Sequence, residues 1–340
     1  MIWNCALPVP PRPSPRVLRV VERVWAAMRS RPEMAGPTLS RAMREERSLG
    51  SKERPVAGDM LLGMVRHERA LARIDPDPVA AWLRLCDGLP DSPDPGDEID
   101  AYAIAVSLPA WLAGEWYRRL GRERALELAR TIAGRAPVWL RALRDPVSID
   151  LPHHREGAAI RLEGRTNVDT LPAFREGRVE VQDLGSQRVA ELAFPGEGGT
   201  VLDLCAGAGG KSLALAAMGA RVTAWDLRPA ALDELHRRAG RCGLDIRVAP
   251  PSGNFDVILV DAPCSGTGVL RRHPEYRWKL HFPVEVQRQL LARARPHAGR
   301  LVYATCSLAR RENEEVAGVE GTIMWPEPLG SDGFYLATLG

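Results

Sequence analysis

The stretch that decides the fold is VLDLCAGAGGKS, residues 201–212. An apolar run from Val201 to Leu204 leads into a glycine-rich loop, and a helical pattern follows over residues 211–218. The first strand, loop and helix of nucleotide-binding α/β folds have this order, because glycines let a ligand approach the backbone closely. The segment therefore predicts an α/β domain that binds a ligand beyond its first strand.

The same alternation of strand and helix continues toward the end of the chain. We expect strands over 201–204, 221–225, 245–249, 256–260, 300–304 and 334–338, and helices over 211–218, 229–241 and 284–295. Strands that alternate with helices in this way are typical of a mostly parallel, doubly wound sheet.

Two further domains are expected before this α/β domain. Residues 1–133 carry apolar side chains at helical spacing, punctuated by prolines, which predicts an all-helical domain. From about Pro137 the chain changes to short apolar runs separated by Gly and Pro, which predicts a small α+β module over 134–192. The α/β domain then covers residues 193–340.

Three ligands compete for the glycine loop. A P-loop for a nucleoside triphosphate fits Gly210-Lys211-Ser212 but needs a glycine where Cys205 stands. A dinucleotide fingerprint needs its third glycine where Ser212 stands. S-adenosyl-L-methionine needs an acid at the strand end, glycines along its body and a second acid for the ribose hydroxyls. The residues that meet these needs are Asp203, Gly207, Gly209 and Asp226.

Two cysteines follow the ends of two other expected strands. Cys264 lies in VDAPCSG, residues 260–266, and Cys306 lies in YATCS, residues 303–307. Because the carboxyl ends of parallel strands line one ligand crevice, both thiols could face the same site. One thiol can attack a ring carbon as a covalent nucleophile, and a second could help to undo the adduct. This pairing favours chemistry on a pyrimidine ring.

The composition excludes several classes of protein. The 340 residues are 45% hydrophobic and 26% charged, which is ordinary for a soluble globular protein. No apolar run is long enough to span a bilayer, and no signal-peptide core is visible, so we expect no membrane association. The six cysteines lack metal-ligand spacing and do not suggest a disulfide framework, so we expect no metal and a cytoplasmic location.

Together these segments resemble the RNA cytosine-C5 methyltransferases, and more closely the bacterial Sun (RsmB-like) group, which modifies 16S ribosomal RNA. The glycine loop, the two cysteine segments and Glu312-Asn313-Glu314 carry the resemblance in the α/β domain. The resemblance also extends to segments outside these motifs. Residues 49–54 and 65–66 resemble a NusB-like helical domain. Residues 181–187, 271–275, Trp278 and 331–335 resemble parts of the chain in and just before the catalytic domain.

The resemblance implies a Rossmann-like, S-adenosylmethionine-dependent methyltransferase domain, preceded by a NusB-like RNA-binding domain and a small RNA-binding module. It implies that Cys306 attacks C6 of cytosine and that Cys264 assists loss of the C5 proton and release. Asp261 would bond the ring near N3, with Lys211 in the same pocket. The implied cofactor-binding residues are Asp203, Cys205, Ala206, Gly207, Gly209, Gly210, Lys211, Asp226, Arg228 and Asp261. The candidate RNA-binding residues are Arg141, Arg271 and Arg272.

Two departures from the family pattern limit which roles the resemblance carries over to this chain. The usual acid after the third strand is missing, because Val248-Ala249 is followed by Pro250-Pro251. An asparagine usual in the RNA-binding module is missing after Leu140-Arg141-Ala142. The expected function is methylation of cytosine C5 in RNA, with 16S ribosomal RNA as substrate and a monomeric enzyme. A transfer RNA methyltransferase, a P-loop NTPase and an RNA-binding scaffold of weak activity remain as alternatives.

Overall fold

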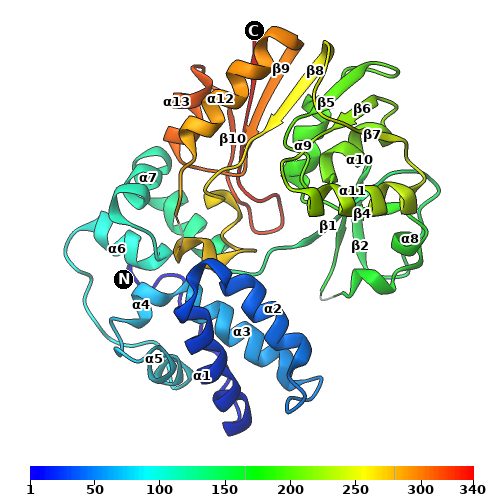
Figure 1. The fold of residues 1–340 in the computed structure, drawn as a ribbon. Helices are drawn as coiled ribbons and strands as arrows, with labels where there is room; N and C mark the ends of the chain where they lie inside the picture. The colour runs from blue at the N-terminus through cyan, green and yellow to red at the C-terminus, as the bar shows by residue number, and fades with distance from the viewer. Residues whose placement is uncertain (165, 279) are drawn as a thin grey trace. The chain divides into compact units, whose positions relative to one another are not determined.

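The computed structural model describes residues 1–164, 166–278 and 280–340, and Figure 1 shows its ribbon. The chain forms two compact units. The first unit is Met1–Arg135 together with Val269–Leu280, and the second is Ala136–Gly268 together with His281–Gly340. The sequence placed one boundary at 133/134, close to the first change of unit. It placed the other at 192/193, inside the second unit, and assigned residues 269–280 to the α/β domain.

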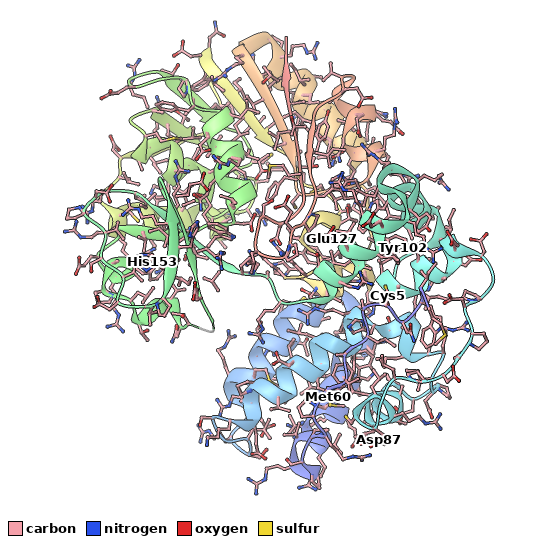
Figure 2. All side chains as sticks on the ribbon, turned by 180° about the vertical axis from the view of Figure 1, so that it is seen from behind. Cys5, Met60, Asp87, Tyr102, Glu127 and His153 are labelled. Atoms are coloured by element: carbon pink, nitrogen blue, oxygen red, sulfur yellow. The ribbon has the colours of Figure 1, made fainter. Side chains whose placement is uncertain are left out.

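The first unit is helical. Its α-helices are α1 (Pro15–Ser30), α2 (Ala35–Glu45), α3 (Glu53–Arg66), α4 (Glu68–Leu71), α5 (Pro78–Cys86), α6 (Glu98–Val106) and α7 (Ala110–Ala133). Helix α1 begins where the Ser14 hydroxyl accepts the Val17 amide and Pro15 takes the first position, which needs no amide donor. Met60 on α3 and Tyr102 on α6 lie in the interior, at 2% and 0% exposure (Figure 2). In the part of the chain that is described, no helix is long and apolar enough to cross a membrane.

The segment Val269–Leu280 packs into this helical unit. It carries the 3₁₀ helix η4 (Pro274–Trp278). The Trp278 ring meets Trp25 of α1 edge-on, with ring centroids 5.4 Å apart, and its indole N–H donates to Glu68. Arg66 of α3 donates to the Arg271 carbonyl at 2.9 Å. The segment therefore shares the core of the first unit although most of the first unit lies more than 130 residues earlier in the chain.

The expected small α+β module has its own sheet within the second unit. Its strands are β1 (Val138–Ala142), β2 (His153–Glu156), β3 (Ala159–Leu162) and β4 (Val179–Val181), in the order β2-β3-β1-β4. All three neighbouring pairs are antiparallel. A small core of buried residues, among them Leu140, Ile160 and Val179, holds the sheet together, with α8 (Pro172–Arg175) beside it.

The Rossmann-like domain is built on a mixed sheet of seven strands. They are β5 (Thr200–Asp203), β6 (Arg221–Ala224), β7 (Ile246–Val248), β8 (Phe255–Asp261), β9 (Ala298–Thr305), β10 (Thr322–Met324) and β11 (Phe334–Leu339). The order is β10-β11-β9-β8-β5-β6-β7. Strands β9 to β7 in this order are parallel, and β11 and β10 extend the sheet antiparallel. The α/β fold class is confirmed, and every expected strand lies within two residues of its predicted bounds.

Helices cover both faces of this sheet (Figure 1). Helices α9 (Leu184–Leu192), α10 (Gly210–Ala217) and α11 (Pro229–Cys242) pack in one core cluster, and α12 (Val284–Ala294) and α13 (Glu314–Ala317) pack in the other. Strand β8 packs apolar side chains on both faces of the sheet. Val257 and Leu259 lie in the first cluster, and Ile258 and Val260 lie in the second. A continuous apolar run in β8 is therefore what this position in the sheet requires.

Candidate active site

The parallel register brings the ends of three strands to one edge of the sheet. Asp203 of β5 pairs with Leu259 of β8, and Asp261 of β8 pairs with Ala304 of β9. Residues that directly follow these strands therefore share the crevice at their carboxyl ends. The glycine loop follows β5, Cys264 follows β8 and Cys306 follows β9. The predicted catalytic residues Lys211, Asp261, Cys264 and Cys306 form two contacting pairs here.

The glycine loop between β5 and α10 needs its glycines for conformation and for space. Gly207 and Gly209 have φ angles of 54° and 84°, in the left-handed region that disfavours residues with a Cβ. A Cβ on Gly209 would also lie 2.5 Å from Cγ of Leu235 on α11. By contrast, a Cβ on Gly210, the first residue of α10, would meet nothing within 4 Å. The loop thus fixes Cys205 and Ala206 between two rigid elements.

Asp203 is a buried acid, and one of its carboxylate oxygens accepts no hydrogen bond from the described residues. Its side chain is 1% exposed, and Oδ2 accepts the Ser212 hydroxyl at 2.7 Å. Oδ1 finds no hydrogen-bond donor among the described residues. Burial raises the pKa of Asp203 to about 6, although the Ser212 bond pulls it down. A buried acceptor without a partner calls for a donor from a ligand, and the ammonium group of S-adenosylmethionine is such a donor.

Asp226 lies at the end of β6, across the glycine loop. One of its oxygens accepts the Gly207 amide at 2.9 Å, and Arg228 holds both oxygens through its guanidinium at 2.9 and 3.0 Å. Burial opposes ionisation, but these bonds outweigh it and lower the pKa of Asp226. The Arg228 side chain is 72% exposed, so it can turn toward solvent and leave lone pairs of Asp226 to ribose hydroxyls.

Lys211 and Asp261 form an ion pair at the centre of the site. Lys211 Nζ lies 2.6 Å from Asp261 Oδ2 and 5.5 Å from the centroid of the Phe334 ring. Burial alone would lower the pKa of Lys211, but the attraction of Asp261 raises it, so the ammonium form persists. A charged donor and a carboxylate therefore stand side by side at the end of β8.

The two predicted catalytic thiols are in contact. Cys264 Sγ lies 3.3 Å from Cys306 Sγ, although 42 positions separate them in the sequence. Backbone bonds tie their loops together, because the Ala262 amide donates to Ala304 and the Gly268 amide donates to the carbonyl of Cys306. The contact with Cys306, followed by burial, raises the pKa of Cys264 well above its ordinary value. Cys264 therefore holds its proton.

Cys205 differs from this pair. Burial raises the pKa of its thiol far above the usual range, and the neighbouring acids Asp203 and Asp261 add to the effect. A thiol held protonated in this way is a poor nucleophile. Cys205 therefore fits the predicted role in the wall of the cofactor site rather than a chemical one.

Two of the three predicted RNA contacts are buried. Arg141 is 3% exposed and pairs with Glu191 in the second unit, while Arg271 is 1% exposed in the first unit. Burial of both side chains counts against direct contact with RNA phosphates. The sequence could not reveal this, because an arginine in a structural pair and one on an RNA surface look alike. Arg272 is half-buried and stays a prediction.

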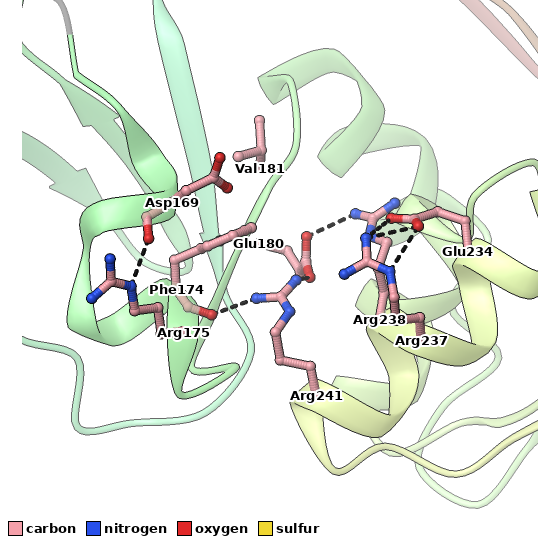
Figure 3. Close-up of a pocket in the computed structure, with 9 residues that line it drawn as sticks. All are labelled: Asp169, Phe174, Arg175, Glu180, Val181, Glu234, Arg237, Arg238 and Arg241. Atoms are coloured by element: carbon pink, nitrogen blue, oxygen red, sulfur yellow. Dashed lines mark hydrogen bonds and ion pairs between the residues drawn. The ribbon is translucent and has the colours of Figure 1, made fainter.

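A charged cavity of about 530 Å³ lies between the small module and α11, within the second unit (Figure 3). Buried Glu180 of β4 accepts Arg238 at 2.8 Å and also pairs with Arg241, both from α11. Arg238 donates with its other nitrogen to the Ala208 carbonyl in the glycine loop at 2.7 Å. The cavity's charges are thus largely paired within the protein, and they link the module to the cofactor loop.

One observation bears on the acid that is missing after the third expected strand. Strand β7 ends at Val248, and the Ala249 amide donates to Ala224 of β6 at 3.3 Å before the two prolines begin. No carboxylate directly follows this strand, as the sequence indicated. In addition, no group of three or more His, Cys, Asp or Glu side chains that could hold a metal is found among the described residues.

Comparisons with known proteins agree with this geometry. Residues 190–320 match the family model described as 16S rRNA methyltransferase RsmB/F. The chain is 34% identical over 256 residues to the ribosomal RNA small subunit methyltransferase B of Erwinia tasmaniensis, covering 60% of this chain and 60% of that protein. It is 37% identical over 197 residues to the protein of that name from Citrobacter koseri, covering 52% and 46%. The chain thus spans about half to 60% of the length of these relatives.

Solved structures show the same fold. The crystal structure of PH0851 matches with a TM-score of 0.74 at 19% identity, covering 96% of this chain and 99% of that one. NSun6 from Pyrococcus horikoshii, solved with SFG, matches with a TM-score of 0.58 at 17% identity, covering 68% and 98%. At these identities the likeness concerns the fold alone.

Proposed function

We propose that this chain, whose residues 190–320 match the RsmB/F methyltransferase model, is a methyltransferase of that family and methylates C5 of a cytosine in ribosomal RNA. S-adenosyl-L-methionine is the cofactor that the family and the site both support, and it supplies an electrophilic methyl group. The observation that carries the proposal is the contact of 3.3 Å between the thiols of Cys264 and Cys306. A cytosine must leave the base stack to reach such a crevice.

In the proposed reaction Cys306 acts first. Its thiolate bonds to C6 of the ring, and the electrons of the C5–C6 double bond move to C5, which then takes the methyl group. Loss of the C5 proton returns electrons to the ring and expels the Cys306 thiolate. Each bond made by the protein is therefore broken again, and the enzyme is regenerated.

The thiol contact explains how Cys264 can serve the second half of this reaction. The contact with Cys306, together with burial, raises the pKa of Cys264 and helps to keep it protonated before the attack. Bonding of Cys306 to C6 ends the hydrogen bond between the two thiols, so Cys264 can give up its proton more readily. Cys264 then lies beside the adduct as a group that can assist removal of the C5 proton.

The Lys211–Asp261 pair would hold the pyrimidine edge. Cytosine presents its amino group as a donor next to N3 as an acceptor. The Asp261 carboxylate can accept from the amino group, while the Lys211 ammonium at 2.6 Å from Asp261 can face the charge that builds near N3. This pairing would favour cytosine and would lower the barrier to attack at C6.

A transfer experiment tests the proposal. The purified protein is incubated with methyl-labelled S-adenosylmethionine and either 16S ribosomal RNA, small subunits or transfer RNA, and modified positions are mapped by bisulfite sequencing. We expect one protected cytosine in ribosomal RNA. Methylation of transfer RNA alone would favour that substrate instead, and magnesium-dependent ATP binding without cofactor binding would overturn the methyltransferase assignment. We also propose a monomer acting in the cytoplasm, and light scattering of the protein in solution checks the monomer.

A further inference from the structure

Two buried polar residues, Glu312 and Asn313, lie behind the cysteine pair. Both are 0% exposed, at the end of the 3₁₀ helix η6 (Arg310–Glu312) and just before α13. Burying a carboxylate and an amide is costly unless every polar atom finds a partner. The hydrogen-bond partners of these two side chains include residues next to Cys264 and Cys306 in the sequence.

Glu312 holds the loop that carries Cys264. Its Oε1 accepts the Ser265 amide at 2.9 Å, and its Oε2 accepts the Ser265 hydroxyl at 2.5 Å. Buried Gln287 of α12 donates both to Glu312, at 3.2 Å, and to the Pro263 carbonyl at 2.9 Å. The residues on both sides of Cys264 are therefore fixed by side chains rather than by a regular strand.

Asn313 holds the loop that carries Cys306. Its side-chain oxygen accepts the Thr305 hydroxyl at 2.6 Å, and its side-chain nitrogen donates to the Ser307 carbonyl at 3.0 Å. One amide thus joins the residue before Cys306 to the residue after it. Only a side chain with both an acceptor and a donor can make this pair of bonds.

The two loops are also joined to each other. Ser265 Oγ lies 3.2 Å from Ser307 Oγ, and Thr267 Oγ1 lies 3.2 Å from Ser307 Oγ. These hydroxyls, together with Glu312 and Asn313, form one buried network that we call the loop clamp. The two thiols that contact each other are carried by the two loops that the loop clamp joins.

We propose that Glu312 and Asn313 are positioning residues, each holding one cysteine loop, and that the loop clamp fixes the distance between the two thiols. Its effect on catalysis rests on the proposed function. Loosening Glu312 frees the Cys264 loop, so release of the product should slow. Loosening Asn313 frees the Cys306 loop, so attack on the ring should slow. Misplacing reacting groups by about 1 Å can cost about 100-fold in rate.

The first experiment needs no RNA and no cofactor. Diamide oxidises two neighbouring thiols to a disulfide and is itself reduced to a hydrazine, and peptide mass mapping follows the Cys264–Cys306 link over time. An S–S bond is about 2.05 Å long, so its rate of formation reports how the clamp presents the thiols. We expect Glu312→Ala and Asn313→Ala to form the link about tenfold more slowly or worse, because the thiols lose their effective concentration.

Matched variants separate the clamp from general damage. Glu312→Gln keeps an acceptor for the Ser265 amide and should recover much of the rate. Glu320→Ala removes an acid of the same segment whose side chain is 80% exposed, and it should match the wild type. If the alanine variants do not fold, Ser265→Ala and Thr305→Val loosen the clamp from the partner side, and Thr305→Ser restores the hydroxyl.

The second experiment looks for opposite defects. On a denaturing gel with RNA and cofactor, we expect Glu312→Ala to accumulate a covalent RNA adduct and Asn313→Ala to form less adduct than the wild type. Folded variants with wild-type disulfide rates and wild-type adduct levels would overturn the clamp. A slowed disulfide in the variants, with no methyl transfer by the wild type, would keep the clamp and reject the proposed function.

Discussion

At the residue scale, alanine substitutions of Cys306 and Cys264 are expected to stop the reaction at different steps. Cys306→Ala removes the nucleophile, so methyl transfer and the covalent RNA adduct should both disappear. Cys264→Ala should still allow attack but stall the release, so the adduct should appear as a slow band on a denaturing gel. Cys86→Ala, which changes a cysteine of the first unit, serves as the control. A trapped adduct in Cys306→Ala would exchange the two roles.

Asp203 couples cofactor binding to pH and to stability. Its pKa of about 6 in the folded protein stands above the ordinary 3.8, so the folded state favours the protonated form. This contribution to stability is present below pH 3.8 and is lost as pH rises through 6. The shift corresponds to about 3 kcal/mol at pH 7, since one pKa unit is about 1.4 kcal/mol. Asp203→Asn should therefore stabilise the protein at pH 7 by up to that amount, measured by urea unfolding.

The same residue should make cofactor affinity depend on pH. Ionised Asp203 attracts an ammonium group and protonated Asp203 does not, so S-adenosylmethionine should bind more tightly as pH rises from 5 to 7. Calorimetry across this range checks the trend, and Asp203→Asn should bind weakly with a flatter profile. A gain in stability without any loss of binding would remove Asp203 from the cofactor site.

At the scale of elements, Glu180 joins β4 of the small module to α11. Its side chain is 4% exposed, between Arg238 and Arg241. Glu180→Gln should leave two partly buried arginines without their counter-charge and cost about 3 kcal/mol. It should also weaken cofactor binding, because Arg238 bonds the Ala208 carbonyl. Thermal unfolding and calorimetry measure the two effects.

Glu234→Gln is the matched control for this prediction. Glu234 also pairs with an arginine of α11, Arg237, but that arginine side chain is 69% exposed. Exposed ion pairs contribute at most about 1 kcal/mol, so this variant should unfold almost like the wild type. Equal losses in the two variants would contradict a bridging role for Glu180.

Elements with strong apolar patterns were predictable, and the side-chain network around them was not. Strand β8 could be placed because its apolar run ends in Asp261. Strand β10 was missed. The motif Glu312-Asn313-Glu314 could be quoted from the sequence, but its bonds to Ser265 and Thr305 depend on loops that meet only in the fold.

At the scale of the whole molecule, the division of the chain was only partly visible in the sequence. Helical spacing ends near residue 133, and the first unit's long segment ends at Arg135. Residues 269–280 follow Cys264 closely in sequence, and nothing in their spacing indicates that they pack with helices of residues 1–135. Trp278 is an example. An aromatic side chain can pack in any apolar core, and only the fold brings Trp25 against it.

The shared core of the first unit makes a truncation experiment informative. A chain that begins at residue 136 keeps Val269–Leu280 but loses the helices that bury Leu270, Arg271 and Arg277, all at most 9% exposed. We expect this fragment to aggregate or to unfold at markedly lower urea concentration than the full chain. Co-expression with residues 1–135 should restore solubility. A soluble, fully stable fragment would show that the segment does not need the first unit.

The packing of the segment 269–280 with the first unit also limits how this protein can be recombined with a relative. A swap of residues 1–135 for the equivalent part of a relative would replace most of the first unit's core while keeping Leu270, Arg277 and Trp278, which pack in it. Such a chimaera should work only when the donor's own version of 269–280 travels with it. The chain is therefore inherited as two interleaved parts, and substitutions at Trp25 and Trp278 are expected to change together across descendants.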